Sequence, residues 1–219
     1  MLRLGDVFGS PYLGVYCSAN ERYAIVPEGA EASFIKDVSE TLQVEVVRTY
    51  IAGSTLLGSL VAMNSNGIVV TNFAEKQELA RLPKELRVGV MEEKLNAAGN
   101  NIVANDRAAC IHPAASRRSV QMVEDVLGVE VRRCAIAGIE TVGSVCLATA
   151  KGVVCHPRTP DEELKELSSL FGVPAAVATL NYGTPYVGAC ALANSKGAMV
   201  GSRSTPIELG RIEDGLGLF

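Results

Sequence analysis

The chain repeats one pattern of apolar and polar positions. In each copy an apolar run starts near a glycine and is followed by a polar turn and then by a second apolar run. Three segments align without gaps: GSLVAMNSNGIVV from Gly58, GSVCLATAKGVVC from Gly143 and GACALANSKGAMV from Gly188. Two weaker copies start at Gly14 and Gly99, so the five anchor glycines lie 44, 41, 44 and 45 residues apart. Self-similarity at such a period is typical of repeat architectures. The pattern therefore predicts five structural units.

Two further positions in each copy predict tight turns. Six residues after the anchors the chain has Asn20, Asn64, Asn105, Thr149 and Asn194, and nine residues after the three clear anchors it has Gly67, Gly152 and Gly197. Asparagine can cap its own turn and glycine accepts a positive φ, so we expect a hairpin there. Five residues before the anchors stand Gly9, Gly53, Gly138 and Gly183, with Lys94 in the third copy. This GxxxxG spacing predicts a second turn, which follows an incoming strand such as VEVVRTYIA.

Helical patterns fill the intervals between copies. In TPDEELKELSSLFG we expect Thr159 to cap a helix, Glu162 to complete a capping box and Gly172 to end it, and the same Thr-Pro start predicts a last helix over residues 205–214. That last helix has no strand after it, whereas LRLGDVF at the start has no helix before it. Each unit is thus predicted as strand, strand, strand, helix, and the N-terminal strand completes the fifth unit. The predicted fold is one α/β domain over residues 1–219, a five-fold pseudosymmetric ring or α-β propeller.

Composition and charge exclude several classes of protein. The 219 residues are 48% hydrophobic and carry a formal net charge of −4, which argues against non-specific coating of nucleic acid. Residues 167–195 are uncharged, but Pro174, Asn181 and Pro185 divide that run into strand-length pieces, so we expect no membrane span. Six cysteines occur without a CxxC motif, and no apolar leader precedes MLRLGDVFG. We therefore expect free thiols and a cytoplasmic location.

The stretch CLATAKGVVCHP gathers two cysteines and one of the two histidines, which raises the possibility of a nucleophile or a zinc site. In the repeat alignment Cys146 takes the place of Val61 and Ile102, and Cys155 takes that of Val70, so both thiols are expected to be buried core residues. His156 matches His112 at a strand exit before proline, where a ring that bonds a backbone carbonyl is the simpler interpretation. We expect no catalytic residue, metal or cofactor.

Several blocks together resemble the translation initiation factor 6 family in its archaeal form: AGSTLLGSL, LNAAGNNIVAND, VEVRRCAIAG with TVGS and HP, LSSLFGVP, and VGACALANSKGAMVGS with the closing IEDGLGLF. The resemblance covers the whole chain and implies a pentein-type ring. It also implies a non-enzymatic factor, here expected to be a monomer, that binds the joining face of the large ribosomal subunit and sterically blocks the small one. Its implied partners are a ribosomal protein, with the sarcin-ricin loop of the large rRNA nearby; a further role in large-subunit maturation stays open.

The GxxxxG turns should emerge on one rim of a closed repeat, and that rim is the predicted binding face. Ser54 and Asn100 match the family's ribosome contacts most closely. Geometry extends the candidate set to Ser10, Tyr12, Thr55, Asn101, Glu140 and Thr184.

Two alternatives stay open. The same ring architecture resembles guanidine-modifying enzymes, the deiminases and amidinotransferases, which use a cysteine close to the C-terminus; here the last cysteine, Cys190, falls inside a repeat strand. The other alternative is a protein that binds a small ligand in the axial opening of the ring, and no sequence motif supports it.

Overall fold

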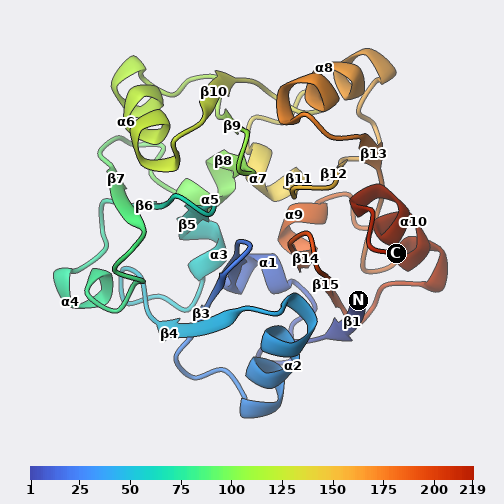
Figure 1. Ribbon diagram of the computed structural model, residues 1–219, viewed down its shortest axis with the longest axis horizontal. Coiled ribbons are helices and arrows are strands. Elements are labelled where there is room, and N and C mark those ends of the chain that lie inside the picture. Colours follow the sequence, from blue (N-terminus) through green and yellow to red (C-terminus); the bar gives the residue numbers. More distant parts are fainter.

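Five three-stranded sheets surround a central axis in the computed structural model, which describes residues 1–219 (Figure 1). The sheets are β2 (Ser18–Ala19), β3 (Tyr23–Pro27) and β4 (Glu45–Thr49); β5 (Val61–Met63), β6 (Gly67–Thr71) and β7 (Arg87–Met91); β8 (Ile102–Ala104), β9 (Ala108–Ile111) and β10 (Glu130–Arg133); β11 (Cys146–Ala148), β12 (Val153–Cys155) and β13 (Ala175–Val177); and β14 (Ala191–Ala193), β15 (Ala198–Gly201) and β1 (Leu2–Gly5). In every sheet the inner hairpin is antiparallel and the outer strand is parallel to its neighbour. The predicted five units are confirmed.

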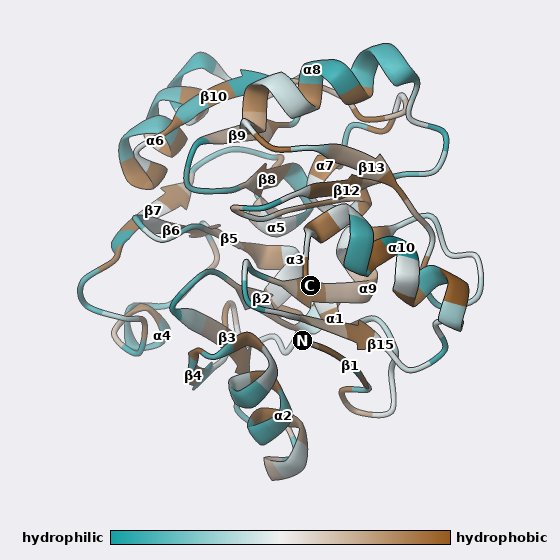
Figure 2. Ribbon diagram, turned by 45° about the vertical axis from the view of Figure 1, so that its right-hand side comes forward, coloured by the Kyte–Doolittle hydropathy of each residue, from teal (hydrophilic) through white to brown (hydrophobic).

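One helix per unit packs on the outside of the ring: α2 (Ala32–Leu42), α4 (Lys76–Leu79), α6 (Arg117–Leu127), α8 (Asp161–Phe171) and α10 (Pro206–Leu216) (Figure 1). Their outer faces are hydrophilic, and the strands inside them are hydrophobic (Figure 2). The buried side chains form five clusters of 10 to 12 residues, so no single core dominates.

The helix starts match the sequence in part. Thr205 and Glu208 form the capping box at α10. The Thr159 hydroxyl instead donates to the His156 carbonyl oxygen at 2.7 Å, α8 begins after Pro160 and no side chain caps it. The predicted box with Glu162 is wrong, because Glu163 and not Glu162 is the third residue of this helix.

Five short helical turns next to the axis were not expected from the sequence: α1 (Leu13–Tyr16), α3 (Leu57–Leu60), α5 (Ala98–Asn101), α7 (Val142–Val145) and α9 (Val187–Cys190). The anchor glycines lie in them and not in hairpins. A Cβ atom added to Gly99 would stand 1.8 Å from the carbonyl oxygen of Gly58, and one added to Gly58 would stand 2.0 Å from that of Gly14. The same relation continues through Gly143 and Gly188 and returns to Gly14. Glycine is therefore required because five backbones meet around the axis.

The hairpin asparagines connect neighbouring units as well as capping their own turns. Asn64 Oδ1 accepts hydrogen bonds from the backbone N–H groups of Asn66 and Gly67, which confirms the cap. Its Nδ2 donates to the carbonyl oxygens of Asn105 in the next unit, at 3.1 Å, and of Leu127, at 2.9 Å. Asn20, Asn105 and Asn194 also donate across to the next unit. Thr149 makes no such bond, so the fourth unit lacks one link.

The predicted reason for the hairpin glycines is wrong. Gly67, Gly152 and Gly197 do not have positive φ values. A Cβ atom on Gly152 would instead lie 2.0 Å from the carbonyl oxygen of Gly215 in α10, and the other two glycines meet helix backbones in the same way. They allow an outer helix to approach the hairpin.

The N-terminal strand closes the ring as predicted. β1 pairs in parallel with β15, with Leu2 opposite Ala198 and Gly5 opposite Gly201. Both chain ends lie in this same unit (Figure 1). No helix is long and apolar enough to cross a membrane.

Candidate binding rim

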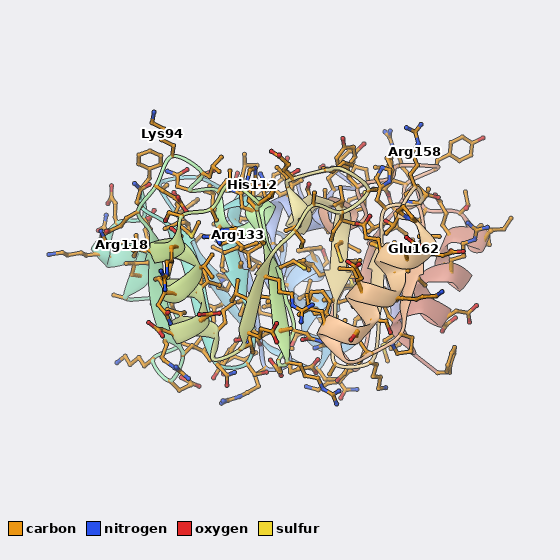
Figure 3. The ribbon with its side chains drawn as sticks, turned by 90° about the horizontal axis from the view of Figure 1, so that it is seen from above. Lys94, His112, Arg118, Arg133, Arg158 and Glu162 are labelled. Atoms are coloured by element: carbon orange, nitrogen blue, oxygen red, sulfur yellow. The ribbon has the colours of Figure 1, made fainter.

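The strands β1, β4, β7, β10 and β13 all end at one face of the ring, because each runs parallel to its neighbour in an equivalent sheet. The segments that follow them are the first to fifth rim turns, residues 6–12, 50–56, 92–97, 134–141 and 178–186. Lys94, His112 and Arg158 stand along the same edge in the side view (Figure 3). We call this face, made of the rim turns and of the loops after β3, β6, β9, β12 and β15, the turn rim.

Four rim turns close with a small backbone bridge, and the third does not. The bridges join Val7 to Ser10, Ile51 to Ser54, Ile136 to Ile139 and Leu180 to Thr184. The third turn is the copy in which Lys94 replaces the glycine. GxxxxG therefore does mark a turn: Gly9, Gly53, Gly138 and Gly183 all have positive φ.

Glutamates from the outer helices hold three of these turns. Glu78 accepts hydrogen bonds from the backbone N–H groups of Ala52 and Gly53, both at 2.8 Å, and Glu208 accepts from Tyr182 at 3.2 Å and Gly183 at 2.8 Å. Glu163 accepts from Ala137 at 2.9 Å. All three are the third residue of their helix. A carboxylate is well suited to adjacent N–H groups of a left-handed turn, so these contacts fix the rim.

The hydrogen bonds also change the acidity of two of these glutamates. Partial burial acts to raise the pKa of Glu208, but the N–H groups of Thr205 and Gly183 and the Thr179 hydroxyl, which bond its charged form, lower it below the usual value. Burial also opposes the shift at Glu78, and N–H donors from Glu75, Gly53 and Ala52 likewise lower its pKa. Both groups are therefore held ionised.

The fifth rim turn is one residue longer than the first, second and fourth. Its bridge spans Leu180 to Thr184, and Asn181, Tyr182 and Gly183 have φ values of 48°, 63° and 94°. Three consecutive left-handed residues are unusual, and a tyrosine there is strained. The Tyr182 side chain is 84% exposed as a result.

The candidate contact residues are all on the turn rim or beside it, but they are not equally accessible. Ser10 and Ser54 accept bonds through Oγ from the N–H groups of Tyr12 and Leu56, so their hydroxyls also shape their own turns. Thr55 and Thr184 are half-buried, and Tyr12 is 40% exposed.

The remaining three candidates differ from one another. Asn100 is half-buried at the end of α5, with no hydrogen bond from its side chain. Asn101 is only 4% exposed, and its Nδ2 donates to the Leu95 carbonyl oxygen at 3.0 Å, so its side chain holds the third turn from within. Glu140 is exposed and lies 3.3 Å from Nε2 of His112.

Sequence reasoning named Tyr12 but missed six other exposed apolar side chains on this rim, which are Phe8, Tyr50, Leu56, Phe73, Tyr182 and Tyr186. Several of these side chains stand one to three residues from the GxxxxG glycines in the sequence. Their position in the repeat could therefore have identified them. An exposed group of large apolar side chains on one face is typical of an interaction surface.

The two histidines have the structural role expected of them, through a different bond. His112 Nδ1 and His156 Nδ1 accept hydrogen bonds from the backbone N–H groups of Ala114 and Arg158, both at 3.1 Å, and do not bond the predicted carbonyl. Burial, and then the charge of Arg158, lowers the pKa of His156.

The axial cavity is small, and most of the residues that line it are hydrophobic. It has a volume of about 90 Å³ and is lined by the anchor glycines and the innermost strands, with Cys17 and Cys146 as its thiols. Burial raises the pKa of both thiols, so the nucleophilic thiolate is disfavoured. No histidine or carboxylate lines this cavity, all six cysteines are free, and no group of three or more His, Cys, Asp or Glu side chains is placed to hold a metal ion.

Comparison with known proteins assigns the chain to a family. The model of the eIF-6 family matches residues 2–215. The chain is 42% identical over 214 residues to translation initiation factor 6 of Thermoplasma acidophilum, covering 98% of this chain and 99% of that protein. It is 42% identical over 214 residues to the factor of the same name from Methanoculleus marisnigri (98% and 97% covered), and 40% identical over 219 residues to that of Pyrococcus horikoshii (97% and 96% covered). These relatives are named as translation initiation factors and not as enzymes. The chain belongs to the eIF-6 family of translation initiation factors.

Proposed function

We propose that this protein binds the joining face of the large ribosomal subunit through its turn rim and thereby prevents the small subunit from associating. The observation that carries the proposal is the asymmetry of the rim. The repeat places equivalent turns on one face, yet each turn presents different side chains, as a surface that recognises one partner must. Family membership supports a role in translation initiation.

The charge of the rim supports a basic protein as one partner. Exposed glutamates lie on the rim of the first three units and on the turn that follows them: Glu28, Glu31, Glu75, Glu92 and Glu140, with Lys94 among them. Glu28 and Glu92 pair with Arg81 and Arg118, and the other three carboxylates make no ion pair with lysine or arginine. Complementary charge steers a partner toward the correct face. This acidic sector suits a basic ribosomal protein better than RNA.

The mechanism is exclusion by volume and needs no chemistry. A ring that rests with one rim on the large subunit keeps its opposite rim, made of the hairpin turns, in the space that a small subunit would enter. A stable dock of this kind buries on the order of 1,000 Å² or more. The protein would act in the cytoplasm, where subunits join.

The direct test is co-sedimentation of the purified protein with separated archaeal large and small subunits on sucrose gradients. We expect binding to the large subunit alone, and fewer joined particles when small subunits are added to the complex. Absence of binding to the large subunit at low salt would contradict the proposal.

Asn100→Arg gives a sharper test. Asn100 lies beside the rim with no bond from its side chain, so the longer, charged side chain should leave the fold intact and clash with the bound partner. We expect at least a tenfold loss of subunit binding, about 1.4 kcal/mol. Gln43→Arg adds the same charge to an exposed residue at the C-terminal end of α2 and should bind normally. Equal binding by the two variants, both with wild-type melting temperatures, would show that Asn100 is not in the interface.

A further inference from the structure

Five equivalent loops follow β3, β6, β9, β12 and β15 on the turn rim, and all of them close with the same backbone hydrogen bond. In each loop an N–H group donates to the carbonyl oxygen of the third residue before it, over 3.0–3.2 Å. The pairs are Ala30 to Pro27, Ala74 to Thr71, Ala115 to His112, Thr159 to His156 and Ser204 to Gly201. The loops therefore share one turn and differ in the side chain of its first residue.

In three of these loops the first side chain also accepts a hydrogen bond from the N–H group two residues later. In the second unit the acceptor is the hydroxyl of Thr71, 3.4 Å from the nitrogen of Phe73. In the third and fourth units it is Nδ1 of His112 and of His156, at 3.1 Å in both. The other two loops begin with proline or glycine and have no side-chain acceptor. Only the two imidazoles are groups that gain a proton near neutral pH.

These bonds require both imidazole rings to be neutral. An Nδ1 atom that accepts a bond from an N–H group carries no hydrogen, so the single ring hydrogen is on Nε2. In His112 that hydrogen faces Glu140, whose Oε2 lies 3.3 Å from Nε2. A second proton would place a hydrogen on Nδ1, directly against the N–H group of Ala114, and attraction would become repulsion. Because His112 and His156 are each only 7% exposed, their rings reach water only if the loop moves.

The surroundings of His156 oppose that second proton. Burial, and then the charge of Arg158, lowers the pKa of the ring. Tyr186 of the fifth rim turn packs edge-on against it, with ring centroids 6.4 Å apart. Residues 161–163 begin α8 with three carboxylates, but none forms an ion pair with His156. A charged His156 therefore has no partner at its buried position.

His112 lies near charges of both signs. Glu140 of the fourth rim turn faces its Nε2 and attracts a charged ring. Two further charged groups bond the backbone of this loop: Glu93 Oε2 accepts from the Ser116 N–H group at 3.3 Å, and Arg133 Nε donates to a carbonyl oxygen at 2.8 Å. Glu140 can hold a charged His112 through Nε2, but the bond from the loop to Nδ1 is lost all the same.

We propose that the loops of residues 112–115 and 156–159, here called the histidine loops, make the turn rim sensitive to acid. When His112 and His156 gain a proton, the bonds to Nδ1 are lost, the rings leave their buried positions and the two loops loosen, while the Thr71 loop keeps its structure. This response needs no partner. Its effect on subunit binding rests on the proposed function, because the histidine loops belong to the face that is proposed to dock.

The first test measures the histidine loops in the full chain, without a partner, by NMR at about pH 7.5 and about pH 5. At the higher pH the ¹⁵N shifts should show both rings neutral, with the hydrogen on Nε2. We then follow the protection of single amides, which is their hydrogen-exchange rate relative to an unstructured amide at the same pH. On acidification the protection of the Ala114 and Arg158 amides should fall about tenfold, since each loses one hydrogen bond. The Phe73 amide is the internal control and should keep its protection.

The direction of the pH effect follows from the lowered pKa of His156. The contribution of its neutral ring is complete above the unfolded value of about 6.5 and is lost as pH falls through the folded pKa. Protection of the Arg158 amide should therefore be constant above about pH 6.5 and decrease below it.

The double variant H112N/H156N separates this response from general loosening in acid. The asparagine Oδ1 atom lies close to the position of Nδ1, accepts the same bond and does not titrate, so the protection of both amides should be nearly equal at the two pH values. H112A/H156A lacks the acceptor and should show low protection at both. The proposal is overturned if neutral wild-type rings carry their hydrogen on Nδ1, if wild-type protection does not fall, or if the asparagine variant loses as much protection as the wild type.

Co-sedimentation with large subunits at the same two pH values tests the consequence for binding. On acidification the wild type should lose at least about threefold more affinity than H112N/H156N does. If neither protein binds at the higher pH, the proposed function is wrong and the acid response of the histidine loops stands. If both bind there and lose affinity equally, the inferred effect of the histidine loops on docking is wrong.

Discussion

At the scale of single residues, the anchor glycines show how one atom limits the fold. A Cβ atom on Gly99 would lie 1.8 Å from the carbonyl oxygen of Gly58, and this contact is between backbones, which cannot turn away as a side chain can. We expect Gly99→Ala to destabilise the protein by about 3 kcal/mol or more. Thermal or urea unfolding measures the loss.

Gly210→Ala is the matched control for that substitution. Gly210 lies inside α10, and a Cβ atom there meets nothing within 4 Å. Alanine should stabilise the helix by about 0.5–1 kcal/mol. Similar destabilisation by both variants would mean that loss of glycine flexibility, and not the axial contact, decides the outcome.

The sequence alone located the repeated glycines but did not show why glycine is required at these positions. Regular spacing located Gly58, Gly143 and Gly188, and elementary turn chemistry then suggested hairpins. The real cause is contact between units that are more than 40 residues apart in the sequence, which a local pattern does not contain. The same limit applies to Asn64. The cap that its Oδ1 forms within its own turn is local and was predicted, whereas the hydrogen bond from its Nδ2 to Asn105 in the next unit is not local and was not predicted.

At the scale of elements, an outer helix and a rim turn are joined by one carboxylate. Glu208 accepts bonds from two turn N–H groups and from its own helix cap. Glu208→Gln would keep the shape but turn an NH2 group toward at least one donor, so we expect a loss of about 1–3 kcal/mol at pH 7, measured by urea unfolding. Glu162→Gln, an exposed side chain in the first turn of α8, should change little.

The pH dependence of that loss follows from the lowered pKa. Because the folded pKa of Glu208 is below its unfolded value of about 4.3, its contribution is complete above that value and disappears as pH falls through the folded pKa. The stability difference between wild type and Glu208→Gln should therefore be constant from pH 7 to about 5 and shrink toward pH 3. A difference that grows on acidification would contradict the assigned role.

Elements were predicted well where their pattern is long, and poorly where it is short. The outer helices α8 and α10 have 11 residues each and were predicted from their starts and apolar pattern, whereas the outer helix α4 has only four residues. The axial helices have four residues each, too few to show a period, and they were missed. The GxxxxG turns were found from their glycines, but the longer fifth turn escaped notice because its additional residue stands before Gly183 and leaves the spacing to Gly188 unchanged.

At the scale of the whole molecule, the ring combines a symmetric scaffold with an asymmetric rim. Equivalent glycines and asparagines repeat around the axis and hold the units together, while the rim turns and loops carry different side chains. Repetition explains why the fold could be predicted from one sequence. For the binding residues, the sequence predicted only the face on which they lie. Specificity depends on residues that differ between the units, and an alignment of the units does not show which of these differences contribute to binding.

Closure of this ring depends on the first few residues. Without β1 the fifth sheet keeps only β14 and β15, and it loses the buried side chain of Val7 together with the backbone pairing of Leu2–Gly5. An unpaired strand edge also invites association with other chains. Deletion of residues 1–8 should therefore lower the melting temperature and promote oligomers, measured by calorimetry and light scattering. Removal of Phe219, which is 88% exposed, is the control and should change neither.

Complementation distinguishes loss of closure from general damage. If β1 acts by pairing with β15, the peptide MLRLGDVF added in excess should raise the melting temperature of the truncated protein, since a ligand that binds only the folded state stabilises it. A scrambled peptide of the same composition should not. A truncated protein that melts like the full chain would show that four complete units and a two-stranded fifth hold the ring without its N-terminal strand.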